Sequence, residues 1–210
     1  MASPRKPARP LRADAARNRE LILAAAEVEF TKRGLSAAVA DITRRAGVAK
    51  GTFFRHFTTK DDLITAIVEP HIVKLASIGE RLVGAADPGA ALLEFLTEAA
   101  AQRQQRDISY LLRAGVAPPR VTELRDDLLA TISRLVERAR TSGALRKDVT
   151  ATDVFLLMCA PNHVVESLPD AGPDLWRRYL AIIFDGLRPE GAHHLPHPAP
   201  TILEPTRSRR

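Results

Sequence analysis

Side chains that suit binding to a polyanion gather between residues 50 and 60. Lysine and arginine match the paired acceptor atoms of guanine or the oxygens of a phosphate, and a hydroxyl or an imidazole adds hydrogen bonds. A glycine among them lets the backbone come close to a bound molecule. The set consists of Lys50, Gly51, Thr52, Arg55 and His56. These residue types at this spacing indicate a surface for nucleic acid.

A short helix and a tight turn precede this set. Ile42 and Ala46 are four residues apart and are expected to share the inner face of a helix over residues 39–46. Gly47 comes directly after it and permits a left-handed turn. Val48 is then placed to fill the angle between this helix and the next.

A second short helix over residues 49–56 is expected to carry the polar set. Phe53 and Phe57 bury its inner face, so the basic and hydroxyl side chains face outward. Its first turn also offers free amides with a partial positive charge. A helix of this size fits the major groove of DNA, so the pattern predicts a helix-turn-helix.

The charge is concentrated toward the amino-terminal end. Residues 1–60 hold 13 lysine and arginine residues against 5 acidic ones, a net charge of +8. Residues 61–188 carry −3, and the whole chain of 210 residues carries +6. The asymmetry favours a polyanion-binding head on a separate body, although a solvated charged face gives many proteins the same bias.

The stretch from residue 18 to residue 68 resembles the amino-terminal domain of the tetracycline-repressor (TetR) family. Many spaced matches carry the resemblance, which covers about a quarter of the chain. They are Ile22, Leu23, Ala25, Ala26, Phe30, Gly34, Ile42, Ala46, Gly47, Val48, Lys50, Gly51, Thr52, His56, Phe57, Lys60 and Leu63. The family implies a homodimeric transcription regulator, most often a repressor. A small molecule bound in its carboxy-terminal domain moves the two recognition helices apart.

The resemblance also implies which side chains contact double-stranded DNA, at a near-palindromic operator. Lys50, Thr52 and Arg55 are expected to reach bases or nearby phosphates, and Lys60 to clamp a phosphate. The full expected set is Arg44, Lys50, Gly51, Thr52, Phe54, Arg55, His56 and Lys60. Arg44 and its neighbour Arg45 fit a solvated helix face equally well. A basic arm is expected to follow the minor groove or the phosphates, through Arg5, Lys6, Arg9 and Arg12.

Three positions depart from the family pattern. Ala38 stands where a capping threonine or serine is usual, which costs the helix about 1 kcal/mol unless Ser36 compensates. Phe54 replaces a tyrosine and so lacks a hydroxyl for phosphate. Thr43 replaces a small alanine between the two helices and needs either more room or an internal hydroxyl bond.

Helical spacing continues through the rest of the chain and predicts an all-α fold of about nine helices. The expected helices cover residues 17–33, 39–46 and 49–56, a long segment after Thr59, a segment after Asp87, and residues 108–114, 121–139, 154–168 and 175–187. Capping boxes are expected at Thr59 with Asp62 and at Thr150 with Asp153, and Pro70 is expected to bend or interrupt its helix.

The expected domains are an arm (1–14), a DNA-binding domain (15–60), a ligand-binding and dimerisation domain (61–188) and a disordered tail (189–210).

Two apolar segments near the end of the chain predict a dimer. The segment from Val154 to Leu168 begins with a run that is apolar all round. The segment from Leu175 to Leu187 carries two apolar stripes, one of Leu175, Tyr179 and Ile182 and one of Trp176, Leu180, Ile183 and Leu187. A helix with two apolar sides needs two partners, so we expect the same helix pair of a second subunit to cover one side. A fully internal helix pair is the alternative.

A pocket for an unidentified small molecule is expected in residues 61–188. Apolar or adaptable side chains with polar handles are its candidate lining: His71, Phe95, Tyr110, Phe155, Met158, Asn162, His163 and Trp176. The same apolar side chains also suit an ordinary core. Pro161 is expected to kink the helix around it, as prolines near cavities do.

Two other readings stay open from the sequence. One is an α-helical enzyme that uses Cys159 and His163, which are four residues apart, as nucleophile and base or as metal ligands. The other is a DNA-binding regulator without a small molecule, responsive to a peptide or architectural. We expect no cofactor and no metal, because the chain has a single cysteine and no glycine-rich phosphate loop. Without a secretion signal or a long apolar run, the protein is expected in the cytoplasm, on the nucleoid.

Overall fold

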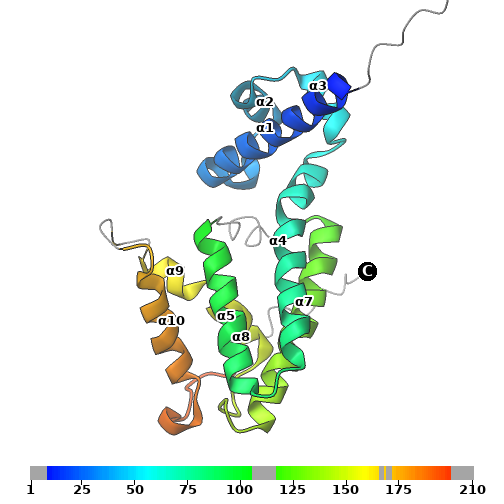
Figure 1. Ribbon diagram of the computed structural model, residues 1–210. Coiled ribbons are helices and arrows are strands. Elements are labelled where there is room, and N and C mark those ends of the chain that lie inside the picture. Colours follow the sequence, from blue (N-terminus) through cyan, green and yellow to red (C-terminus); the bar gives the residue numbers. More distant parts are fainter. Residues whose placement is uncertain (1–8, 106–116, 166–167, 169–171, 200–210) are drawn as a thin grey trace, which may run out of the picture. The chain divides into compact units, whose positions relative to one another are not determined.

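A computed structural model describes residues 9–105, 117–165, 168 and 172–199 (Figure 1). Helices form in these ranges and no strand does, so the predicted all-α class is confirmed, with a number of helices close to the nine expected. The helix expected at residues 108–114 lies outside the described ranges. No helix in the described ranges is long and apolar enough to cross a membrane.

The described chain divides into two compact units. The first unit contains the amino-terminal helices, which are α1 (Arg9–Arg33), the 3-10 helix η1 (Gly34–Ser36), α2 (Val39–Ala46), α3 (Lys50–His56) and the start of α4 (Lys60–Val83). The second contains the rest of α4, then α5 (Pro88–Gln105), most of α7 (Pro119–Thr141), α8 (Ala151–Leu157), α9 (Ala160–Val165), α10 (Leu175–Gly186) and the 3-10 helix η2 (Pro189–Gly191). The chain passes from the first unit to the second within α4, after Glu69.

The core of the first unit is the apolar face that the spacing predicted. Ile22, Phe30, Ile42 and Phe53 are fully buried and come from three different helices. Gly47 ends α2 in the left-handed conformation, with φ of 66°, and its amide donates back to carbonyls of the last turn. The chain can therefore reverse sharply between α2 and α3.

The first helix is longer than the sequence analysis predicted. It begins at Arg9 rather than at residue 17, so the prediction that residues 1–14 form a flexible arm is wrong from residue 9 onward. Arg9 and Arg12 belong to α1, while Arg5 and Lys6 lie outside the described residues. Pro10 falls in the first turn, where a proline leaves no helical hydrogen bond unmade.

The start of α4 carries the predicted capping box. The Thr59 hydroxyl accepts from the Asp62 amide at 3.0 Å, and the Asp62 carboxylate accepts from the Thr59 amide at 2.8 Å. The helix then continues through Pro70 without interruption, so the break considered there does not occur. Pro70 is exposed.

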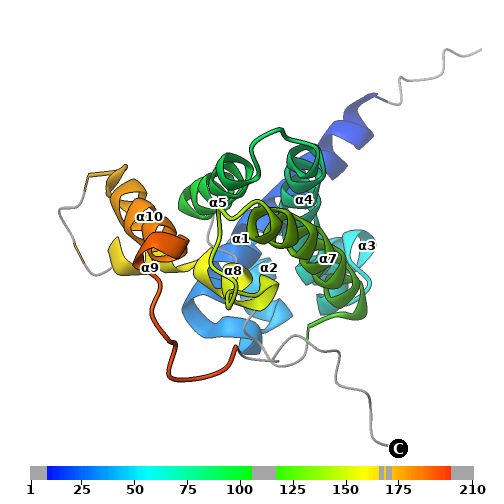
Figure 2. The same cartoon turned by 90° about the horizontal axis from the view of Figure 1, so that it is seen from below.

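Helices α4, α5 and α7 form the main bundle of the second unit, seen end-on in Figure 2. Phe95 of α5 is fully buried beside Gly79 of α4, where a Cβ atom would lie 3.2 Å from the Phe95 ring and 2.6 Å from Thr131 Cγ2. Only glycine allows this approach. The adjacent Glu80 accepts from the Thr131 hydroxyl at 2.7 Å and pairs with Arg134, joining α4 to α7.

The apolar segment expected to form one helix over residues 154–168 is two helices. The capping box at Thr150 and Asp153 is present and starts α8, but α8 ends at Leu157 and α9 begins at Ala160. The helix therefore breaks before Pro161 instead of kinking at it. The physical reason is that a proline inside one continuous helix would remove a hydrogen bond and clash with the preceding turn. In the first turn of α9, the missing amide of Pro161 costs nothing.

The two stripes of α10 have different surroundings. Trp176, Leu180 and Leu187 are buried in the second unit, whereas Ile182 is 54% exposed. Beyond α10, the prediction of a disordered tail is wrong at its start. Residues Pro189–Gly191 form a 3-10 turn, and the His193 carbonyl accepts from Arg146 Nη2 at 2.6 Å.

Candidate nucleic-acid interface

Helix α3 presents one buried and one exposed face. Phe53 is fully buried, and Phe57, which caps the helix, is only 3% exposed. Lys50, Gly51, Phe54 and Arg55 are exposed, while Thr52 and His56 are half-buried. The structure thus brings the predicted contact residues of α3 together on the outer side of one helix.

Contacts within α3 order its charged side chains. Arg55 Nε lies 3.3 Å from the Gly51 carbonyl, and Arg55 Nη2 lies 3.4 Å from the Thr52 hydroxyl. The Lys50 ammonium lies 5.9 Å from the centre of the Phe54 ring. Each contact joins residues three or four apart, so both cations lie along the outer face instead of extending freely from it.

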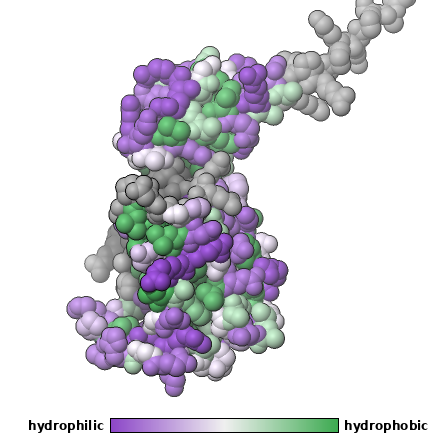
Figure 3. Space-filling model, turned by 60° about the vertical axis from the view of Figure 1, so that its left-hand side comes forward, coloured by the Kyte–Doolittle hydropathy of each residue, from purple (hydrophilic) through white to green (hydrophobic). Residues whose placement is uncertain are grey.

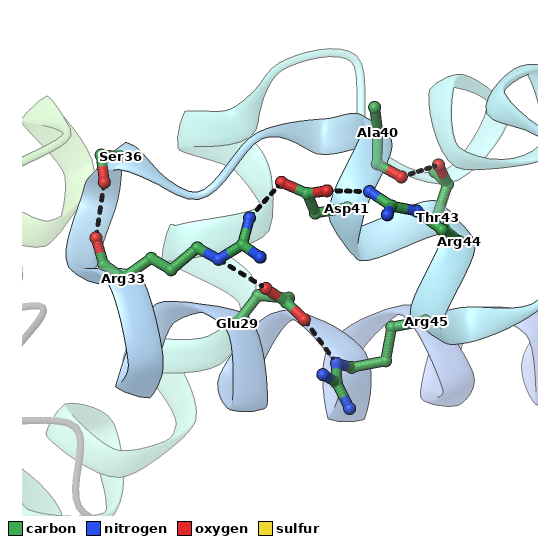
Figure 4. A network of polar contacts seen from close by, with 8 residues as sticks. All are labelled: Glu29, Arg33, Ser36, Ala40, Asp41, Thr43, Arg44 and Arg45. Carbon is green, nitrogen blue, oxygen red and sulfur yellow. Dashed lines mark hydrogen bonds and ion pairs between the residues drawn. The ribbon is translucent and has the colours of Figure 1, made fainter.

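A charged network joins α1 to α2 (Figure 4). The Glu29 carboxylate is buried and accepts from Arg45 Nε at 2.6 Å, and its other oxygen lies 3.5 Å from Arg33 Nε. Arg33 also donates to Asp41 at 2.6 Å, and Asp41 pairs with Arg44 through its second oxygen. The hydrogen bond from Arg45, with the charges of the nearby cations, holds the pKa of Glu29 below its usual value.

The network explains how α2 tolerates its missing cap. No side chain caps the helix at Ala38, and Ser36 does not compensate, because its hydroxyl donates to the Arg33 carbonyl at 2.6 Å. Asp41 instead places a negative charge in the first turn of α2, where it interacts favourably with the helix dipole. The ion pair with Arg33 connects this charge to α1. The departure at Thr43 is met by an internal bond from its hydroxyl to the Ala40 carbonyl at 3.1 Å.

The sequence analysis missed Glu29, Arg33 and Asp41 as parts of this site. One signal was present, since Glu29 follows Ile22 by seven residues and therefore lies on the buried stripe of α1. A carboxylate on such a stripe needs a cationic partner. The network also gives Arg44 and Arg45 acidic partners within the protein, so a role for Arg44 at DNA stays a prediction.

Lys60 is directed inward. Its ammonium donates to the Leu35 carbonyl and lies 5.5 Å from the centre of the Phe30 ring. Partial burial lowers the pKa of Lys60 below its ordinary value. The Lys60 ammonium therefore links α4 to η1. A contact from Lys60 to a DNA phosphate stays a prediction, and it would compete with this internal hydrogen bond.

The residues predicted to line a pocket have different environments. Phe95 is fully buried and Trp176 is 3% exposed, as core residues are. Met158 is buried, Phe155 and His71 are half-buried, and His163 is exposed, while Tyr110 lies outside the described residues. Asn162 is buried and donates to the Ala100 carbonyl at 2.8 Å, but its Oδ1 atom accepts no hydrogen bond in the described part of the chain.

Comparisons with known proteins match both parts of the chain. The model described as "Bacterial regulatory proteins, tetR family" matches residues 22–67, and "Transcriptional regulator SbtR-like, C-terminal domain" matches residues 87–189.

Two curated relatives match the amino-terminal part. The Bacillus subtilis regulator YvdT is 45% identical over 51 residues, which are 24% of this chain and 26% of the relative. The Mycolicibacterium smegmatis activator FasR is 42% identical over 62 residues, 29% of this chain and 28% of the relative. The chain thus spans about a quarter of the length of these relatives.

Solved structures match over most of the chain. A TetR regulatory protein from Mycobacterium vanbaalenii is 32% identical and covers 85% of this chain and 99% of its own, with a TM-score of 0.48. CprB from Streptomyces coelicolor is 25% identical and covers 85% of this chain and 92% of its own, with a TM-score of 0.60. Together with the outward face of α3, the two family models lead to one conclusion. The chain belongs to the TetR family of DNA-binding transcription regulators and is not an enzyme.

Proposed function

We propose that the chain acts as a homodimer that binds a near-palindromic operator through α3 and represses transcription until a small apolar or amphipathic molecule releases it. The observation that carries the DNA-binding part is the outer face of α3, where Lys50, Gly51, Phe54 and Arg55 are exposed above a buried Phe53. Lys50 and Arg55 suit guanine or phosphate, and Thr52 and His56 flank them. The protein then acts on the nucleoid.

Apolar side chains left exposed near the carboxy-terminal end support the homodimer. The exposed side chains are Leu156 of α8 at 47%, Val164 of α9 at 42%, Leu168 at 45% and Ile182 of α10 at 54%. Apolar patches are visible on the surface of the second unit in Figure 3. A second copy of α8, α9 and α10 would cover these side chains and set two α3 helices one turn of DNA apart, roughly 34–36 Å.

The buried Oδ1 atom of Asn162 supports an effector. A buried acceptor without a partner costs free energy, and a ligand hydroxyl or amide that donates to it would recover that cost. We propose that a molecule with one such donor on an otherwise apolar body binds beside Asn162. The continuous helix α4 has residues in both units and is the proposed route by which this binding alters DNA affinity.

Activation of transcription is the second candidate, because FasR, the relative that is 42% identical over 62 residues, is named as an activator. One experiment addresses both. Duplexes are selected from a random pool with the purified full-length protein, and the selected operator is placed upstream of a reporter gene. The proposal predicts a palindromic consensus and lower reporter output when the protein is present. Higher output supports activation, and a pool without any consensus contradicts sequence-specific binding.

A further inference from the structure

We propose that Phe54 reads the methyl group of a thymine in the major groove. The inference rests on the proposed function, since it requires α3 to enter the groove. It adds a chemical preference at one operator position, which basic side chains alone do not provide.

The first observation is the exposure of the Phe54 ring. Phe54 is 47% exposed, although phenylalanine is ordinarily among the buried residue types. It lies three and four residues from Gly51 and Lys50 and is next to Arg55, so it belongs to the same outer face as the charged side chains. The phenyl ring is thus the apolar centre of a polar surface.

The second observation is that the ring has a fixed support. Phe54 meets the ring of Phe53 edge to face, with centroids 5.2 Å apart and planes at 82°. Phe53 is itself fully buried, so the support is part of the core. On the preceding turn, a Cβ at Gly51 would meet no atom within 4 Å apart from those of its chain neighbours and of the helix backbone, so Gly51 leaves open space on the helix surface.

The chemistry of the groove then selects the partner. A phenyl ring neither donates nor accepts an ordinary hydrogen bond, so it gains little from a phosphate and cannot read a donor or acceptor pattern. Among the base edges in the major groove, the apolar group is the C5-methyl of thymine. Covering the ring with that methyl removes apolar surface of both molecules from water, which is favourable.

Deoxyuridine provides the test, because it lacks only this methyl group. Each thymine of the selected operator half-site is replaced by deoxyuridine in turn, and binding of wild type, Phe54→Ala, Phe54→Leu and Arg55→Ala is measured by fluorescence anisotropy. Wild type is expected to lose about three- to fivefold in affinity at one position of each half-site. Phe54→Ala binds thymine and deoxyuridine equally there, and Phe54→Leu keeps part of the difference. Arg55→Ala is the control, with weaker binding to the operator but the same ratio of thymine to deoxyuridine affinity at that position.

Either of two results would overturn this inference and leave the proposed function standing. One is a wild type that binds its operator tightly yet responds to deoxyuridine at no position, and the other is a Phe54→Ala protein that keeps the wild-type response. Melting temperatures of the variants verify that they are folded. A wild type that selects no duplex at all overturns the proposed function as well, so the two failures are distinguishable.

Discussion

Glu29 of α1 and Arg45 of α2 form a hydrogen-bonded ion pair, with Nε 2.6 Å from Oε1. The carboxylate is buried, whereas the arginine side chain is 39% exposed. Because Arg33 lies 3.5 Å from the other carboxylate oxygen and also reaches Asp41, one buried anion organises contacts to both ends of α2. The helix that supports α3 is therefore fixed by electrostatics where its capping residue is missing.

Replacement of Glu29 by glutamine is expected to lower the melting temperature by several degrees at neutral pH, since Arg45 and Arg33 lose a charged partner. The sign of the pH dependence follows from the lowered pKa of Glu29. A carboxylate with a depressed pKa stabilises the fold fully above its ordinary value of 4.5 and loses that contribution as the pH falls. The difference between wild type and Glu29→Gln should thus shrink as the pH falls below 4.5. Glu20→Gln, with a side chain 76% exposed, is the control. A difference that grows toward low pH would contradict the assignment.

Lys60 allows a structural role to be separated from a DNA contact. Lys60→Met keeps most of the aliphatic chain but leaves the Leu35 carbonyl without its donor, so we expect a lower melting temperature. Because the ammonium is engaged inside the protein, we expect the slope of log K against log salt to stay as in wild type. A phosphate clamp predicts a slope smaller by about 0.9 for each Lys60 that contacts a phosphate. A slope that decreases by this amount, with an unchanged melting temperature, would show that Lys60 contacts a phosphate instead.

The dimer is tested at Ile182. Ile182→Asp places a charge on the exposed stripe of α10 and is expected to give a monomer in size-exclusion chromatography with light scattering. Operator affinity should fall at least about 100-fold, since the two half-sites are no longer bound together. Val73→Asp is the matched control, because Val73 is 47% exposed on α4, outside the proposed interface. Dimers of equal stability in both variants would exclude α10 from the interface.

Asn162 separates effector binding from stability. Asn162→Leu removes the unpaired Oδ1 atom together with one hydrogen bond. The free energy of unfolding without effector should therefore stay within about 1 kcal/mol of the wild-type value, or rise. Any small molecule that raises the melting temperature of wild type should stabilise the variant much less. A panel of apolar alcohols and amides is screened against both proteins by thermal shift. A ligand that stabilises both equally does not use Asn162.

Local signals predicted the parts of the structure that are set by neighbouring residues. The two capping boxes and the left-handed Gly47 were foreseeable, because each depends on a few residues close in sequence. The outer face of α3 followed from the positions of Phe53 and Phe57.

Features set by more distant contacts were not foreseeable in the same way. The early start of α1 was missed because its first two turns contain one large apolar side chain, Leu11, and so show no apolar stripe. The break between α8 and α9 was missed because an apolar run carries no periodicity that marks an interruption. The Glu29 network depends on α1 and α2 packing together, which spacing alone does not reveal.

The most direct test of the account compares wild type and Arg55→Ala on two duplexes, the selected operator and a scrambled sequence, by anisotropy titration at a fixed physiological salt concentration. Wild type should bind the operator at least about 1,000-fold more tightly than the scrambled duplex. Arg55→Ala should lose most of that ratio while binding the scrambled duplex nearly as well as wild type, because a base contact is removed and most phosphate contacts stay. Equal affinity of wild type for both duplexes, or an unchanged ratio in Arg55→Ala, would contradict the claim that α3 reads the operator.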